Sequence, residues 1–167
     1  MDALQAPESY FVSAAEGWLE LGNIAEALAE LTHIQETLQS HPEVLQVRWA
    51  ICVHEKNWPM ALEVSRALLE LYPHLSVGWL HRAYAIRRVP EGGLQAAWDA
   101  LFPVLEKFAD TAIIPYNLAC YACQMGQLDQ ARELLSRAIK TGRKNQIKQL
   151  ALDDSDLKPL WPEIHEL

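Results

Sequence analysis

A six-residue pattern recurs four times along this chain at nearly constant spacing. Each copy has two small or polar residues, an apolar residue, two variable residues and an alanine. The closing residues, Ala27, Ala61, Ala97 and Ala131, are 34, 36 and 34 positions apart. A period of roughly 20–50 residues is typical of architectures in which one supersecondary unit stacks on the next. The period therefore constrains the architecture of most of the chain.

Each copy divides at this pattern into two stretches with helical periodicity. Apolar or small residues recur at helical spacing before the pattern, as at Trp79, Ala83 and Ile86, and after it, as at Leu135 and Ala138. Alternation of the strand type is absent, so we expect an all-α fold. The predicted helices, joined by short turns, cover residues 8–21, 24–40, 43–55, 58–71, 76–88, 93–108, 111–125 and 128–141.

The arrangement resembles the tetratricopeptide repeat (TPR) family. The fourth copy carries the family signature most fully, from Pro115-Tyr116-Asn117-Leu118-Ala119 through the turn residue Gly126 to Ala131 and Ala138. The resemblance implies a right-handed α-solenoid of about four helix-turn-helix repeats in one domain. We place the repeats at about 8–41, 42–75, 76–111 and 112–142, with a capping segment at 143–167.

Two copies depart from the family pattern. In the second, Lys56 replaces the turn glycine and Trp49 occupies a position that is usually small. We expect this helix pair to pack more loosely or at a shifted angle. In the third, the turn over residues 87–93 is two residues longer, which explains the single spacing of 36.

The C-terminal segment is predicted to close the stack of repeats. Residues 144–152 have the pattern of an amphipathic helix, and the acidic run 153–156 begins a last turn with Leu157, Leu160 and Trp161. The segment is similar to the closing repeat of a group of bacterial TPR proteins. We interpret it as a capping helix; a tail that mimics a ligand, or that regulates the groove, is the alternative.

Charge is distributed unevenly. Residues 1–75 hold 11 acids and 3 bases, residues 76–149 hold 6 acids and 10 bases, and the net charge is −8. An acidic field of this kind repels nucleic acid and anionic lipid, so we expect neither as a partner. The start has no basic segment ahead of an apolar run, and no apolar stretch reaches the roughly 18 residues of a bilayer span. We therefore expect a cytoplasmic protein.

Residues suited to catalysis or metal binding form no recognised constellation. Cys120 and Cys123 form a C-x-x-C pair, but they fall in the middle of a predicted helix, where buried small side chains are the ordinary interpretation. Cys52 is isolated, and the histidines lack H-x-x-x-H spacing. We predict no catalytic residues, no metal site and no cofactor, and hence no enzyme; thiol chemistry at the cysteine pair is the enzymatic alternative.

The TPR resemblance implies a binding groove, because the first helix of each repeat lines the concave surface in that family. The positions concerned are His54, His81, Tyr84, Arg88, Tyr116, Asn117, Cys120 and Gln124. Tyr, Arg and His suit recognition because they combine a large contact area with a polar tip. The alternatives are that the tyrosines only pack between helices and that Arg87 and Arg88 only offset a helix dipole.

The sequence therefore predicts a non-enzymatic scaffold that binds a protein or peptide segment, with acidic or aromatic side chains, in the concave groove. Two other interpretations stay open. A chaperone like those of type III secretion fits the size and acidity but usually has three repeats. A self-assembling module, and hence a homo-oligomer, would pair the acidic segment 1–43 of one copy with the basic residues of another.

Overall fold

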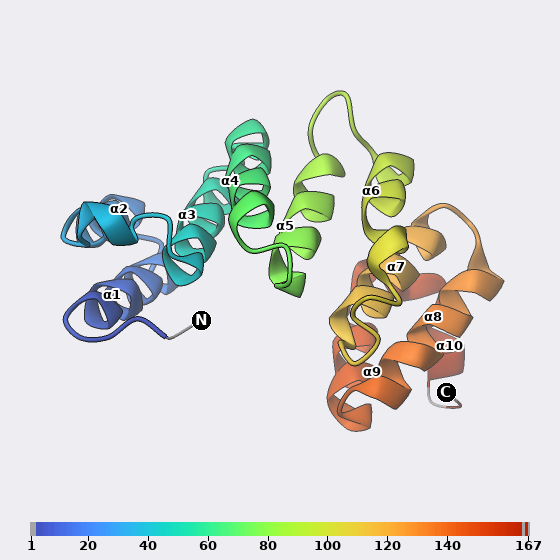
Figure 1. Cartoon of the computed structure of the whole chain (residues 1–167). Helices are drawn as coiled ribbons and strands as arrows, with labels where there is room; N and C mark the ends of the chain where they lie inside the picture. The colour runs from blue at the N-terminus through green and yellow to red at the C-terminus, as the bar shows by residue number, and fades with distance from the viewer. Residues whose placement is uncertain (1–2, 165, 167) are drawn as a thin grey trace. The chain divides into compact units, whose positions relative to one another are not determined.

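The computed structural model describes residues 3–164 and 166 (Figure 1). All regular elements in this range are helices. None of the described helices is both long enough and apolar enough to cross a bilayer. The chain divides into two compact units, Met1–His81 and Arg82–Leu167, which we call the N-terminal and C-terminal units and describe separately. Their boundary falls within α5 (Ser76–Ile86), and the predicted single-domain organisation stays a prediction.

Helix pairs build the N-terminal unit. Its elements are α1 (Glu8–Glu20), α2 (Ile24–Thr32), the short 3-10 helix η1 (Glu36–Leu38), α3 (Pro42–His54) and α4 (Trp58–Leu71). α1 packs against α2 and α3, and α3 packs against α4. Apolar side chains from α1, α2 and α3 form one core, among them Val12, Leu19, Leu31, Val44 and Ile51. Ala27 and Ala61, which close the repeated pattern, are fully buried.

In the N-terminal unit, the α1–α2 and α3–α4 turns share a left-handed residue followed by a capping asparagine. Gly22 has φ 74° and Lys56 has φ 56°, so the lysine adopts the conformation for which glycine is favoured. Asn23 and Asn57 follow, and each side-chain oxygen accepts a hydrogen bond from the backbone three residues on, at 3.3 and 3.2 Å. The turn geometry is thus kept where the glycine is lost.

The prediction of one helix over residues 24–40 is wrong, because α2 ends at Thr32. The Gln39 side chain folds back and donates to the carbonyl of Leu31 at 2.9 Å and to that of Ile34 at 2.7 Å. Those carbonyls need a partner once the helix stops, and the amide supplies it. Helical periodicity continues past the true end because Ile34 is still buried in the core.

The C-terminal unit holds the remaining elements. They are the end of α5, then α6 (Leu94–Leu101), the 3-10 helix η2 (Phe102–Val104), α7 (Ile113–Gln124), α8 (Leu128–Thr141), α9 (Lys144–Asp153), the 3-10 helix η3 (Ser155–Leu160) and α10 (Trp161–Ile164). α7 packs against α6, α8 and η3, and α9 packs against α8 (Figure 1). The Ala97 and Ala131 side chains are fully buried.

Residues 93–108 do not form the single helix that the periodicity predicts. α6 ends at Leu101, and Pro103 occupies the next short turn, η2. Proline has no backbone N–H, and its ring clashes with the carbonyl four residues earlier, so the helix cannot continue through it. The long turn before α6 depends on Gly92, where a Cβ atom would lie 1.7 Å from the Ile86 carbonyl oxygen.

The tail, by which we mean α9, η3 and α10, completes the core of the C-terminal unit. Leu157, Leu160 and Ile164 are fully buried, and η3 packs on α7 and α8. The Trp161 indole N–H donates to the carbonyl of Ala151 at 3.0 Å, which fixes α10 to α9. The packing of these side chains is consistent with the predicted cap, whose bounds stay a prediction. Residues 165 and 167 of the predicted segment, like residues 1–2 of the predicted domain, lie outside the described residues.

Candidate functional site

Four of the predicted groove residues line one cavity in the C-terminal unit. The cavity has a volume of about 280 Å³, and these four are Tyr84, Arg88, Asn117 and Cys120. The others that line it are Arg87, Tyr121, Asp154, Ser155 and Asp156. Polar and charged groups therefore dominate the walls, and we call this space the α7 cavity.

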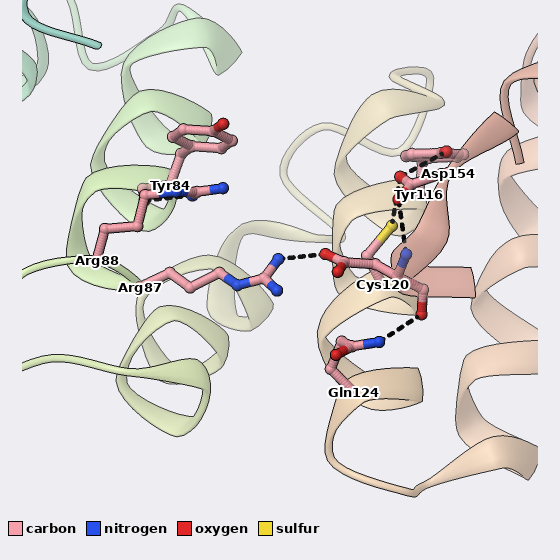
Figure 2. Close-up of polar contacts among 8 residues, drawn as sticks. Tyr84, Arg87, Arg88, Tyr116, Cys120, Gln124 and Asp154 are labelled. Carbon is pink, nitrogen blue, oxygen red and sulfur yellow. Dashed lines mark hydrogen bonds and ion pairs between the residues drawn. The ribbon is translucent and has the colours of Figure 1, made fainter. Parts of the chain in front are cut away.

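Helical spacing explains why the cavity residues of α7 share a face, whereas Arg88 lies in the turn just after α5. Asn117, Cys120 and Gln124 stand three and seven positions apart on α7, on one side of the helix. Tyr84 and Arg88 are four apart, and the Arg88 guanidinium carbon lies 3.5 Å from the centre of the Tyr84 ring (Figure 2). An Arg88 N–H also donates to the Tyr84 carbonyl at 3.0 Å, so the cation is held over the ring.

Acidic residues of the tail form the opposite wall of the cavity. The Asp154 carboxylate accepts a hydrogen bond from the Tyr116 hydroxyl at 3.0 Å and from the Cys120 thiol at 3.5 Å (Figure 2). It also accepts from the backbone N–H of Asp156 at 2.9 Å. The Gln124 amide donates to the Asp156 carbonyl at 2.9 Å. Three predicted groove residues thus hold the chain's own tail.

The groove predicted from the sequence did not include five of the residues that line this cavity, namely Arg87, Tyr121, Asp154, Ser155 and Asp156. Arg87 forms an ion pair with Asp156, and its guanidinium carbon lies 5.6 Å from the centre of the Tyr121 ring. The Tyr121 hydroxyl is buried with no hydrogen-bond partner among the described residues. The acidic run that contains Asp154 was a signal, but spacing along the chain does not show that it meets α7.

Burial and the local charges set the protonation of the cavity walls. Burial raises the pKa of Tyr121 to about 12, and it also raises the pKa of the Cys120 and Cys123 thiols. The hydrogen bond to Asp156 raises the pKa of Arg87, whereas burial lowers the pKa of Arg88. The thiols therefore stay protonated at neutral pH and are poor nucleophiles.

Two solved structures of MamA match this chain, with the same TM-score of 0.63 and 17% sequence identity. One is the MamA RS-1 ArsTM double mutant, with 98% of this chain and 96% of that chain covered. The other is MamA from residue 41 to its end, from Desulfovibrio magneticus RS-1, with 99% and 97% covered. The fold is TPR-like.

MamA contains TPR repeats, so the expected all-α solenoid of TPR type is confirmed by this likeness. No family model and no curated protein matches the sequence. In the TPR-type order of elements, α7 is the first helix of the last pair. That is the helix which the resemblance assigns to the binding surface.

The two predicted histidines belong to the N-terminal unit and are not among the residues that line the α7 cavity. His54 is the exposed last residue of α3. His81 stacks on Trp49, with ring centres 3.7 Å apart and planes 2° from parallel. Burial lowers the pKa of His81 to about 4, so this imidazole is neutral at pH 7. Within residues 3–164 and 166, no cluster of His, Cys, Asp and Glu could hold a metal ion.

Proposed function

We propose that this chain is a non-enzymatic protein-interaction module that binds a peptide or protein segment at the α7 cavity. The observation that carries the proposal is the meeting of Tyr84, Arg88, Asn117 and Cys120 in that one cavity. Stacked helix pairs give proteins of this type extended binding surfaces. The bacterial, cytoplasmic setting inferred from the sequence belongs to the same proposal.

The chemistry of the walls favours a ligand with acidic or aromatic side chains. The Arg88 guanidinium lines the cavity, and a guanidinium binds a carboxylate through two parallel N–H donors. The neighbouring Arg87 already pairs with a carboxylate, that of Asp156. The part of the Tyr84 ring that the Arg88 guanidinium leaves uncovered adds an aromatic surface to the cavity wall, which suits an aromatic side chain.

A peptide array tests this assignment. The full chain, fluorescently labelled, is applied to twelve-residue peptides graded by acidic and aromatic content, and binders are measured by fluorescence anisotropy. We expect Arg88→Ala combined with Asn117→Ala to weaken the best binders by about tenfold or more, at unchanged helix content. Arg143→Ala is the matched control, because it removes one charge from an exposed residue of the same unit outside the cavity. Equal binding by the double variant and the wild type would refute the α7 cavity as the site.

Self-assembly is the second candidate, and the charge distribution favours it. Residues 1–75 hold 11 acids and 3 bases, whereas residues 76–149 hold 10 bases. Contacts between opposite charges on two copies would weaken as salt screens them beyond about 8–10 Å. Sedimentation velocity at low and high salt measures this directly. A mass that is independent of salt would remove the argument for self-assembly.

A further inference from the structure

A second cavity lies within the N-terminal unit and takes no part in the proposed function. It has a volume of about 530 Å³, in the range of small-molecule sites. α2, α3 and α4 form its walls, and none of its eleven lining residues is aromatic. The aliphatic part of the wall consists of Leu28, Leu31, Ile51, Met60 and Val64. Leu28 and Met60 are 45% and 51% exposed, so apolar surface is open to solvent here.

Most polar side chains of this cavity already have partners. The Thr32 hydroxyl donates to the Ala29 carbonyl at 2.7 Å. The Asn57 side chain caps α4 by accepting from the backbone of Met60 at 3.2 Å. Gln39 donates both to Leu31 and to Ile34, as described above. Burial raises the pKa of the Cys52 thiol, which keeps it neutral. These groups therefore need no hydrogen bond from a ligand.

The two charged side chains of this cavity are those of Glu55, which is exposed, and Arg48. Arg48 is the one with a buried donor that lacks a partner among the described residues. One of its terminal N–H groups donates to the neutral side-chain oxygen of Gln39. Its Nε atom is buried with no hydrogen-bond partner, and no carboxylate of the described residues forms an ion pair with it. A half-buried cation without a counter-charge is costly, and a guanidinium binds a carboxylate through two parallel N–H donors.

We propose that this cavity binds a linear aliphatic carboxylate, with Arg48 holding the head group and the aliphatic wall holding the chain. The absence of aromatic side chains from the wall favours a flexible chain over a planar ring. Leu28 and Met60 at the rim lose water contact when the chain enters, which adds apolar burial to the ion pair.

Because this part of the chain is acidic, we expect the affinity for the carboxylate to depend on salt concentration in an unusual way. Residues 1–75 hold 11 acids, and Arg48 is one of only 3 bases there. These acids repel an approaching anion over long distances, where salt screens strongly, while the close pair with Arg48 is screened less. Affinity for the carboxylate therefore rises, or stays level, as salt is added from low concentration. An exposed ion pair would weaken instead.

Isothermal titration calorimetry of the full chain with sodium decanoate, and with decanol as the uncharged match, tests the proposal. Decanoate binds more tightly than decanol to the wild type. Arg48→Gln lowers the affinity for decanoate by about tenfold or more and changes the affinity for decanol by no more than about twofold. Arg66→Gln is the matched control: it removes a base from the same unit, its side chain is 58% exposed beside Glu63, and it does not line the cavity.

The contrary results are equally definite. The proposal is overturned if decanol binds as tightly as decanoate, if Arg66→Gln acts like Arg48→Gln, or if neither probe binds. A peptide that ends in aliphatic residues and binds where decanoate does not would also overturn it. Should circular dichroism show that Arg48→Gln does not fold, Leu28→Glu decides the matter. This substitution at the exposed rim places a negative charge, like that of decanoate, at the mouth of the cavity. It weakens the binding of decanoate more than the binding of decanol.

Discussion

The guanidinium of Arg87, just after α5, forms an ion pair with the carboxylate of Asp156, 69 residues further along the chain. The two side chains are only 21% and 26% exposed. The pair joins the end of one helix to the beginning of η3 and sets one wall of the α7 cavity. The tail is thus held both by apolar burial and by charge.

A double-mutant cycle measures this pair. We expect Arg87→Ala and Asp156→Ala each to lower the free energy of unfolding by about 1–2 kcal/mol, because each leaves a partly buried charge without its counter-charge. We expect the double variant to lose less free energy of unfolding than the sum of the two single losses. The difference, which is the coupling energy of the pair, is about 1 kcal/mol. Urea denaturation gives these values. Strict additivity would mean that the pair contributes no coupling.

The hydrogen bond from Tyr116 to Asp154 is a second point of attachment for the tail. Tyr116→Phe removes the hydroxyl and keeps the ring, and we expect a loss of about 0.5–1.5 kcal/mol in the free energy of unfolding. Tyr10→Phe is the control, since the Tyr10 side chain is 70% exposed. Equal unfolding midpoints for the two variants would contradict a stabilising role for the Tyr116 hydroxyl.

The turn between α3 and α4 offers a gain in stability. Lys56 has φ 56°, a conformation in which a Cβ atom is unfavourable and glycine is not. We expect Lys56→Gly to raise the free energy of unfolding by about 0.5–1 kcal/mol. Lys56→Ala keeps the Cβ atom and removes the charge, so it serves as the control and brings no such gain. Thermal and urea unfolding of both variants show whether the gain comes from relief of backbone strain or from removal of the lysine charge.

His81 makes stability depend on pH. Burial lowers its pKa from 6.5 to about 4 in the folded chain. Between these values the unfolded chain binds the proton and the folded chain does not. His81 therefore stabilises the fold fully above about pH 6.5, and this contribution, about 2–3 kcal/mol, is lost as pH falls from 6.5 towards 4.

The His81 contribution is measured by urea unfolding at several pH values. In the wild type the free energy of unfolding falls as pH is lowered from 6.5 to 4. We expect this fall to be smaller in His81→Gln and unchanged in His54→Gln, since His54 is exposed. An NMR titration of the imidazole in the folded chain provides an independent check. A folded-state pKa near 6.5 would refute the assignment.

Sequence periodicity predicted the helices and their pairing well where the signal is local. The alanines at a spacing of about 34 residues are buried at helix contacts, and a left-handed residue with an asparagine recurs at two of the turns. The ends of α2 and α6 were missed for different reasons. Pro103 was a readable stop signal, whereas the bond from Gln39 to Leu31 requires the folded chain.

The candidate site was predictable only in part. Helical spacing placed Asn117, Cys120 and Gln124 on one face of α7, because each turn of helix repeats every 3.6 residues. The actual partners of Cys120 and Gln124, which are Asp154 and Asp156, come from a segment more than thirty residues away. The acidic run can be seen in the sequence, but the sequence does not show that this run packs against α7.

By itself the sequence determined the elements of this protein: where the chain is helical, which helices pair and which alanines lie between them. These follow from short-range rules, since helical periodicity and turn chemistry act over a few residues. Only the tertiary structure decided which side chains share a cavity and that Arg48 has no carboxylate partner among the described residues. Such contacts depend on packing between segments distant in sequence, where burial and shape act together.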